Sequence, residues 1–360
     1  MTSTSNYDSW TIHSDGEIFI RCQFACDVSQ DRYIVVAGGN QRYGMEIRSA
    51  AVYDVTNNSY FILPYLPYGG FCRGVIMNNY FYVAVLHLGL YRICLSRRKE
   101  WEHVDGWKRN HRIEGLVTDG KLIFLIGEKN LITSFDPINN TFRPITYKNH
   151  SMDRYSFSNA VVQGKIDEKI YIMRGTIGSL SSYNIVLYDI TTQSWTQTPP
   201  LPTPLYIFAA VVIDRWILVT GEKYDYDGPI THNVLYDTQT QLWTKANTAF
   251  SKFRRGNRCY VKVGSYIITV GGYDVTSKRF PMTAIHIKDI IPGWRWESFK
   301  TYILLRKLVD EKRAAPINLL VQNLTMDFTD ANFKADVDKV VQKVFTDLPL
   351  DIFRYLLPFL

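Results

Sequence analysis

The chain has 360 residues, 46% of them hydrophobic and 14% aromatic, and it carries a formal net charge of +7. This length suits one large all-β domain with an appendage, or two domains, and the apolar content supports a sizeable core and excludes general disorder. The charge excess is mild and its basic clusters are short, whereas nucleic-acid-binding proteins usually carry a concentrated basic stripe. We therefore expect no nucleic-acid partner.

The chain shows no signal of export or of covalent cross-linking. Its first residues, MTSTSNYDSW, contain neither a basic start nor an apolar run, and no apolar stretch is long enough to span a bilayer. The five cysteines are odd in number and irregularly spaced, which indicates neither a disulfide framework nor a CxxC zinc site. We expect a reducing compartment, the cytoplasm or the nucleus, and no membrane partner.

Residues 1–16 are expected to form an N-terminal arm. The tripeptide SWT at residues 9–11 recurs at residues 194–196, where a strand is predicted. This likeness predicts that the arm supplies an outer strand to the last repeat of the domain. The segment WRWESF at residues 294–299 is the alternative source of that strand.

Residues 17–300 are organised by a repeat. The segments IVLYDITTQSWTQ (185–197) and NVLYDTQTQLWTK (233–245) are nearly the same. Their pattern is an aromatic residue, an acid, and a second aromatic residue seven positions after the first. The pattern also occurs at Tyr53-Asp54 with Tyr60 and at Phe135-Asp136 with Phe142, and looser copies occupy residues 91–101 and 286–294. Missing such a repeat would misassign the whole fold.

An apolar segment that ends at glycine precedes these patterns. The segments occupy residues 33–39, 122–127, 170–175, 216–221 and 266–272, and a copy without the glycine occupies residues 80–85. Glycine at the end of a strand allows a positive φ or a close approach of a neighbouring sheet. Six copies of the repeat therefore cover roughly residues 17–300.

Each copy is predicted to contain four strands. In the fourth copy they are residues 155–162, 169–174, 184–188 and 195–198. The acid after the third strand is expected to accept a backbone N–H in a tight turn, and Trp195 is expected to pack against the neighbouring sheet. A four-stranded sheet cannot bury both faces alone, but six sheets stacked radially can. We predict an all-β, six-bladed β-propeller of four-stranded antiparallel blades.

The double glycine, the Tyr-Asp pair and the later Trp resemble kelch repeats, over about four-fifths of the chain. The second and third copies depart from the pattern, and the second lacks both the glycine and the acid. The resemblance implies a non-catalytic scaffold for protein–protein interaction, with no cofactor and no metal. Kelch-like propellers commonly hold partners on the face that carries the connections between strands two and three and between successive blades.

Binding is expected on that face because variable loops on a rigid scaffold usually carry function. Its predicted loops include residues 39–49, 63–73, 175–183, 199–206, 221–232, 250–258 and 272–281. Tyrosine and arginine dominate interface hot spots. The partner-binding candidates are Arg42, Tyr43, Arg48, Tyr68, Arg73, Tyr224, Tyr226, Phe253, Arg254, Arg255 and Arg279.

The competing hypothesis is a kelch-propeller enzyme or metal-binding protein. The predicted loop 221–232 could gather Glu222, Asp225, Asp227 and His232 around a metal if it folds back on itself. Secreted copper oxidases also use kelch-like propellers, but they need a tyrosine linked to a cysteine, together with histidine ligands. The seven histidines of this chain are mostly scattered, and HExxH, GxSxG, P-loop and GxGxxG patterns do not occur.

Residues 301–360 are expected to form a helical C-terminal extension. The apolar positions of residues 302–309 and 333–344 recur at helical spacing. The ending DLPLDIFRYLLPFL resembles the opening of an F-box, in which a Leu-Pro pair precedes an amphipathic helix; about a dozen residues match. This resemblance implies a substrate adaptor of a ubiquitin ligase, with a ligase component bound by residues 301–360. The alternative is a small helical cap on the propeller.

Overall fold

The computed structural model describes residues 11–12, 21–41, 44–107, 113–127, 132–145, 158–161, 166, 168–175, 185–202, 205–225, 228–246, 258–271 and 282–291. The chain divides into two compact units, Met1–Pro292 and Gly293–Leu360. Every described element belongs to the first unit, so the predicted helical extension at residues 301–360 lies outside the described residues. No helix among the described residues is long and apolar enough to cross a membrane.

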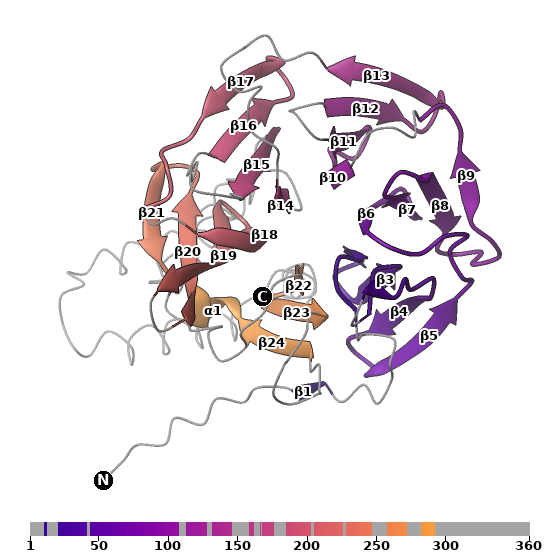
Figure 1. The fold of residues 1–360 in the computed structure, drawn as a ribbon, viewed down its shortest axis with the longest axis horizontal. Helices are drawn as coiled ribbons and strands as arrows, with labels where there is room; N and C mark the ends of the chain where they lie inside the picture. The colour runs from indigo at the N-terminus through magenta and orange to yellow at the C-terminus, as the bar shows by residue number, and fades with distance from the viewer. Residues whose placement is uncertain are drawn as a thin grey trace, which may run out of the picture. The chain divides into compact units, whose positions relative to one another are not determined.

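The described strands form six four-stranded antiparallel sheets, here called blades 1 to 6 (Figure 1). Blade 1 contains β2 (Ala25–Ser29), β3 (Tyr33–Ala37), β4 (Ala50–Asp54) and β5 (Ser59–Leu63). Blade 2 contains β6 (Cys72–Met77), β7 (Tyr80–Val85), β8 (Gly89–Cys94) and β9 (Glu102–Val104). Blade 3 contains β10 (Ile113–Thr118), β11 (Ile123–Gly127), β12 (Ile132–Asp136) and β13 (Thr141–Ile145).

The second half of the domain continues the same order of strands. Blade 4 contains β14 (Ser158–Val161), β15 (Lys169–Gly175), β16 (Ile185–Asp189) and β17 (Ser194–Gln197). Blade 5 contains β18 (Tyr206–Ile213), β19 (Trp216–Asp225), β20 (Gly228–Asp237) and β21 (Leu242–Lys245). Blade 6 combines β22 (Arg258–Val263), β23 (Tyr266–Gly271) and β24 (Met282–His286) with β1 (Thr11–Ile12).

The blades stand in a ring, and their first strands line its centre (Figure 1). Each first strand contacts the first strand of the next blade, in the series β2, β6, β10, β14, β18 and β22, and β22 contacts β2 again. The predicted all-β propeller of four-stranded antiparallel blades is thereby confirmed. Radial stacking covers both faces of each sheet, which a single sheet cannot do.

Blade 6 takes its outer strand from the other end of the chain. Strand β1 pairs antiparallel with β24, with Thr11 opposite Thr283 and Ile12 opposite Met282. The short helix α1 (Ile287–Ile290) follows β24, where blades 1 to 5 have a turn and a fourth strand. The alternative source of this strand, residues 294–299, lies outside the described residues.

The hydrophobic core lies between blades. One cluster joins blades 1 and 2 and includes Val35, Leu63 and Phe81. Comparable clusters join blades 2 and 3, 3 and 4, 4 and 5, and 6 and 1. Strands alternate their side chains between two faces, so each central strand contributes to the cluster on either side of it.

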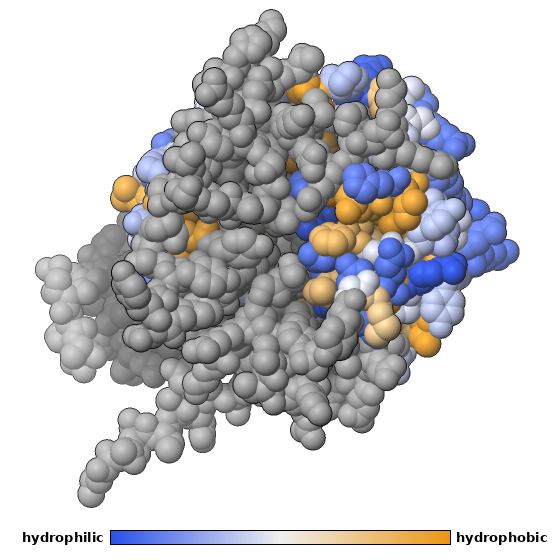
Figure 2. Space-filling model, in the orientation of Figure 1, coloured by the Kyte–Doolittle hydropathy of each residue, from blue (hydrophilic) through white to orange (hydrophobic). Residues whose placement is uncertain are grey.

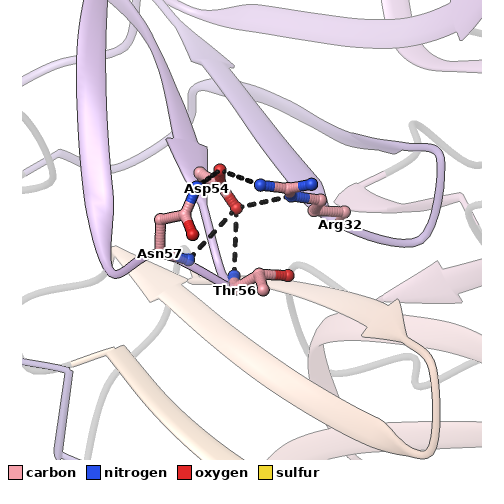
Figure 3. A network of polar contacts seen from close by, with 4 residues as sticks. All are labelled: Arg32, Asp54, Thr56 and Asn57. Atoms are coloured by element: carbon pink, nitrogen blue, oxygen red, sulfur yellow. Dashed lines mark hydrogen bonds and ion pairs between the residues drawn. The ribbon is translucent and has the colours of Figure 1, made fainter.

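The acid at the end of the third strand organises the turn that follows it. In blade 1, Oδ1 of Asp54 accepts the backbone N–H of Thr56 at 3.0 Å, and Oδ2 accepts the side-chain amide of Asn57 at 2.8 Å (Figure 3). Backbone N–H groups two residues on bind Asp136, Asp189 and Asp237 at 2.9 to 3.0 Å. The predicted role of this acid is confirmed in all four blades that carry the full pattern.

An arginine strengthens the turn of blade 1. Arg32 donates Nε and Nη2 hydrogen bonds to the two carboxylate oxygens of Asp54, at 2.8 and 2.6 Å (Figure 3). This bidentate pair, together with the turn N–H groups, lowers the pKa of Asp54 from 3.8 to about 2. Arg215 makes a similar ion pair with Asp237 in blade 5, at 3.2 Å.

The stability contributed by Asp54 should depend on pH in a defined direction. Because its pKa is lower in the folded than in the unfolded chain, this contribution is present above pH 4 and is lost as the pH falls through about 2. The melting temperature of Asp54→Asn should therefore fall furthest below that of the unsubstituted protein at neutral pH, and the difference should shrink toward pH 2. Thermal unfolding at several pH values, with the exposed Glu100→Gln as control, measures this. A difference that stays constant with pH would contradict it.

Tryptophans in or directly before the outer strands bind the connection that follows the preceding blade. Trp243 in β21 donates its indole N–H to the carbonyl of Pro199 at 3.0 Å, and Trp101 donates to the carbonyl of Pro64 at 2.8 Å. Trp243 also packs against the cluster between blades 4 and 5. The side chain of Trp195, for which this packing was predicted, lies outside the described residues.

Candidate partner-binding face

The antiparallel order of the strands places two kinds of connection on one side of the ring. The connections between strands two and three, and those from strand four to the next blade, emerge together, and we call this side the loop face. Its best described part belongs to blade 1. It comprises residues 38–49, without 42 and 43, and residues 64–71.

These two connections of blade 1 are bonded into one surface. The backbone N–H of Gly39 donates to the carbonyl of Gly70 at 2.9 Å, and that of Leu66 donates to the carbonyl of Arg48 at 2.8 Å. The Arg48 guanidinium returns a bond to the carbonyl of Leu66 at 2.7 Å. Leu66 is fully buried beneath them. The backbone of this part of the loop face is therefore fixed by its own contacts.

A buried arginine anchors the longer of the two connections. Arg21 is 2% exposed and donates to the carbonyls of Gly38 and Ser49, both at 2.9 Å, and to the Ser49 hydroxyl at 2.8 Å. It thus holds both ends of residues 38–49. Burial lowers the pKa of Arg21 to about 10, which leaves it charged at neutral pH. The sequence did not single out Arg21, because nothing near it distinguishes it from a surface arginine.

Large apolar side chains are exposed on this anchored surface. Met45 is 59% exposed, Tyr65 66% and Tyr68 48%, and Arg48 is exposed in the same two connections. The ring of Tyr68 lies 6.2 Å from that of Tyr91 in blade 2, so the surface reaches the neighbouring blade. Apolar and hydrophilic residues intermix over the described surface on the right of Figure 2, where Figure 1 places β3 to β9. We call Met45, Arg48, Tyr65 and Tyr68 the blade 1 patch.

The structure places only some of the predicted binding residues. Arg48 and Tyr68 belong to the blade 1 patch, whereas Met45 and Tyr65 were not among the candidates. Two features of the sequence could have identified them: Met45 is a methionine in a predicted loop, and Tyr65 is an aromatic residue flanked by two Leu-Pro pairs. Outside the described residues lie Arg42, Tyr43, Tyr226, Phe253, Arg254, Arg255 and Arg279.

The prediction that Arg73 lies in a binding loop is wrong. Arg73 is half-buried in β6, and its guanidinium donates to the carbonyl of Glu114 at 2.8 Å and to that of Cys72 at 3.0 Å. Glu114 lies in β10, the first strand of blade 3. Arg73 therefore joins two neighbouring first strands. On the preceding blade, Asp27 in β2 does the same by accepting the backbone N–H of Ile76 at 2.6 Å.

The prediction that residues 221–232 form a loop is also wrong. Strands β19 and β20 continue past Gly221 and pair as far as Asp225 opposite Gly228. Tyr224 therefore belongs to β19, and its side chain is not among those that the structure describes. Aromatic and β-branched residues in this segment favour an extended hairpin. The glycine that ends the second strand in other blades does not end it here.

In this hairpin the backbone positions of Glu222, Asp225 and His232 are spread along two extended strands. Glu222 and Asp225 lie on one extended strand, about 10 Å apart at three residues of rise. His232 stands opposite Gly221, and Glu222 stands opposite Thr231. Asp227 lies outside the described residues. Among the residues that the structure describes, no group of three or more His, Cys, Asp or Glu side chains could hold a metal ion.

Part of the chain matches a known protein family. Residues 153–202 match the family model of the Kelch motif. This range contains all four strands of blade 4 and the first of the two echoed segments. The match and the ring of four-stranded blades together identify the repeats of this domain as kelch repeats.

Proposed function

We propose that this kelch-repeat β-propeller is a non-catalytic scaffold that binds a protein partner through its loop face. Kelch propellers commonly serve as scaffolds for protein interactions. The observation that supports this use of the loop face is the blade 1 patch, in which three large apolar side chains are exposed on an anchored backbone. Isolated exposed apolar residues are normal, but a cluster of them is typical of interaction sites.

The chemistry of the blade 1 patch suits protein recognition. Tyrosine, methionine and arginine are enriched at the centres of protein interfaces. The anchoring of residues 38–49 by Arg21 also lowers the cost of binding, because less conformational freedom is lost when the partner docks. The patch presents no pair of titratable groups arranged for acid–base chemistry, so recognition accounts for it better than catalysis.

The patch can be tested with a matched control on the opposite face. We expect the double variant Tyr65→Ser/Tyr68→Ser to bind the partner at least about 30-fold more weakly, the loss expected for hot-spot residues. The control is Ile138→Ser, because Ile138 is 86% exposed in the turn after the third strand of blade 3. Quantitative affinity capture from cell extract identifies the partner, and titration with the purified partner gives the dissociation constant. Equal affinity of the double variant and the control would contradict the proposal, as would one bound transition metal per purified chain.

We further propose that the chain is a substrate adaptor of a ubiquitin ligase. The support is the resemblance of its last residues, DLPLDIFRYLLPFL, to the opening of an F-box. In this arrangement residues 301–360 bind a ligase component while the loop face holds the substrate. Affinity capture with and without residues 301–360 tests the two roles separately. Ligase components should be lost on truncation and substrate partners retained; an unchanged set of partners would contradict the adaptor role.

A further inference from the structure

The seam between blades 6 and 1 differs from the other seams in how the chain crosses it. Each earlier blade is followed directly by the next, whereas this seam is crossed by the segment between β1 and β2. Within the described part of the chain, strand β1 pairs with β24 at Thr11 and Ile12. The rest of the seam is held by contact between β2 and β22 and by a hydrophobic cluster that includes Phe24, Val261 and Ile268.

Two cysteines meet in this seam. Cys26 lies in β2 and Cys259 lies in β22, the two first strands that contact each other. Cys26 is 1% exposed within the cluster, and Cys259 is half-buried and packs against it. Their side chains interact with each other, and both are thiols in the structure. The residues are 233 positions apart in the chain (259 − 26), so only the closed ring brings them together.

We infer that Cys26 and Cys259 are a redox-modifiable pair, which forms a disulfide across the seam when the protein meets a peroxide. A disulfide requires two Cβ atoms about 3.5–4.5 Å apart. The two thiols interact across adjacent first strands and share one apolar cluster, so the bond can form once their Cβ atoms reach this separation. The oxidant is a hydroperoxide, for example hydrogen peroxide.

The chemistry proceeds in two balanced steps. The thiolate of Cys259 attacks the peroxide, whose O–O bond breaks; one oxygen remains on sulfur as a sulfenic acid, and the other leaves as hydroxide and takes up a proton to become water. The thiol of Cys26 then attacks the sulfenic sulfur, so that an S–S bond forms, the S–O bond breaks and a second water leaves. Two thiols lose two electrons, which reduce one peroxide to two waters.

The burial of the two thiols sets the order of these steps. Burial raises the pKa of the Cys26 thiol, which keeps it protonated and shields it from oxidant. Cys259 is the more accessible of the two, and its oxidation places an electrophilic sulfur directly against Cys26. Cys26 is therefore the residue that resolves the sulfenic acid and protects Cys259 from further oxidation.

The disulfide would close the ring covalently between its first and last blades. The disulfide would add a covalent link to the pairing of β1 with β24 and to the non-covalent contacts of the seam. A cross-link that spans so long a segment removes much conformational freedom from the unfolded chain. We expect oxidation to raise the melting temperature by about 5–10 °C, and a reductant to reverse the increase.

The full chain is treated with hydrogen peroxide, denatured, and assayed for thiols and for cross-linked peptides. We expect five thiols before treatment and three after it. Trypsin leaves Cys22 and Cys26 in one peptide, so the cross-link is assigned in a Cys22→Ser variant, where it should join residues 22–32 to residues 259–262. The Cys259→Ser variant should lose both the cross-link and the shift in melting temperature, and Cys94→Ser should keep both.

Three results would overturn the inference. They are retention of five thiols, a disulfide of Cys26 with another cysteine, and a melting temperature that does not rise when the cross-link forms. The peptide map of the chain that retains both cysteines decides the pairing even if Cys259→Ser fails to fold. In that case Cys259→Ala and Cys26→Ala replace it in the thermal measurement, since alanine suits the apolar cluster around both thiols.

Discussion

Replacing Gly39 with alanine is expected to destabilise the propeller by roughly 3–5 kcal/mol. Gly39 follows β3 with a φ of +98°, where a side chain is strained. A Cβ atom there would lie 2.7 Å from both the carbonyl oxygen of Cys22 and the Cβ of Phe24. The backbone N–H of Gly39 also binds the carbonyl of Gly70 in the connection to blade 2. A methyl group at position 39 must therefore push away the backbone of Cys22 or disturb the bond to Gly70, which holds the loop face of blade 1 together.

The control for this change is Gly44→Ala. Gly44 has a similarly positive φ of +77°, but nothing lies within 4 Å of a Cβ at that position. Its substitution should cost only the backbone strain, about 1 kcal/mol. Urea unfolding of the two variants, followed by circular dichroism, isolates the cost of the close approach. Equal losses of unfolding free energy would mean that residue 39 is not crowded.

Replacing Phe135 with alanine should cost roughly 3–5 kcal/mol of unfolding free energy. Phe135 is fully buried in β12 and stacks on Phe142 of β13, with ring centroids 4.5 Å apart. It also lies edge-on to Tyr82 of blade 2 at 6.2 Å. The substitution would open a cavity in the cluster between blades 2 and 3, which rigid sheets on both sides cannot close.

The exposed Ile138→Ala serves as the control for Phe135→Ala, in the same blade. Ile138 is 86% exposed, and its substitution should change stability by less than about 0.5 kcal/mol. Chemical unfolding of both variants provides the measurement. A loss of less than about 1 kcal/mol for Phe135→Ala would show that the core does not lie between the blades.

Local rules account for the parts of the fold that were predicted correctly. The strands of the fourth repeat were predicted to within a few residues, because β-branched residues, turn-forming acids and glycines each act over a short span. Asp189, for example, accepts the backbone N–H of Thr191, two residues away, so this contact is local. These strand and turn features recur among the copies of the repeat, and six copies of a four-strand unit indicated six stacked sheets.

The same reasoning failed where a local signal competed with pairing across strands. Gly221 was expected to end a strand, as Gly38 does, but β19 continues because its partner β20 offers a matching extended segment. Arg73 was predicted to lie in a loop, but its guanidinium donates a hydrogen bond to a backbone carbonyl on the neighbouring blade. In the first case the deciding contact comes from the paired strand of the same hairpin, and in the second it comes from another sheet.

The candidate binding surface was predicted only in outline. Arg48 and Tyr68 were identified by residue type, but the exposure of Met45 and Tyr65 depends on how residues 38–49 and 64–71 bond to each other. Arg21, which anchors these connections, could not be distinguished from a surface arginine without its buried carbonyl partners.

By itself the sequence determined the repeat, the four-strand unit, the turn-capping acids and the glycine at the end of strand two, since each depends on residues a few positions apart. Only the tertiary structure decided which loops become strands, which side chains are exposed on the loop face, and that Cys26 meets Cys259. Those outcomes depend on contacts between strands, connections and blades that leave no periodic trace in the sequence, and the two cysteines in particular meet only because the ring closes between residues more than two hundred positions apart.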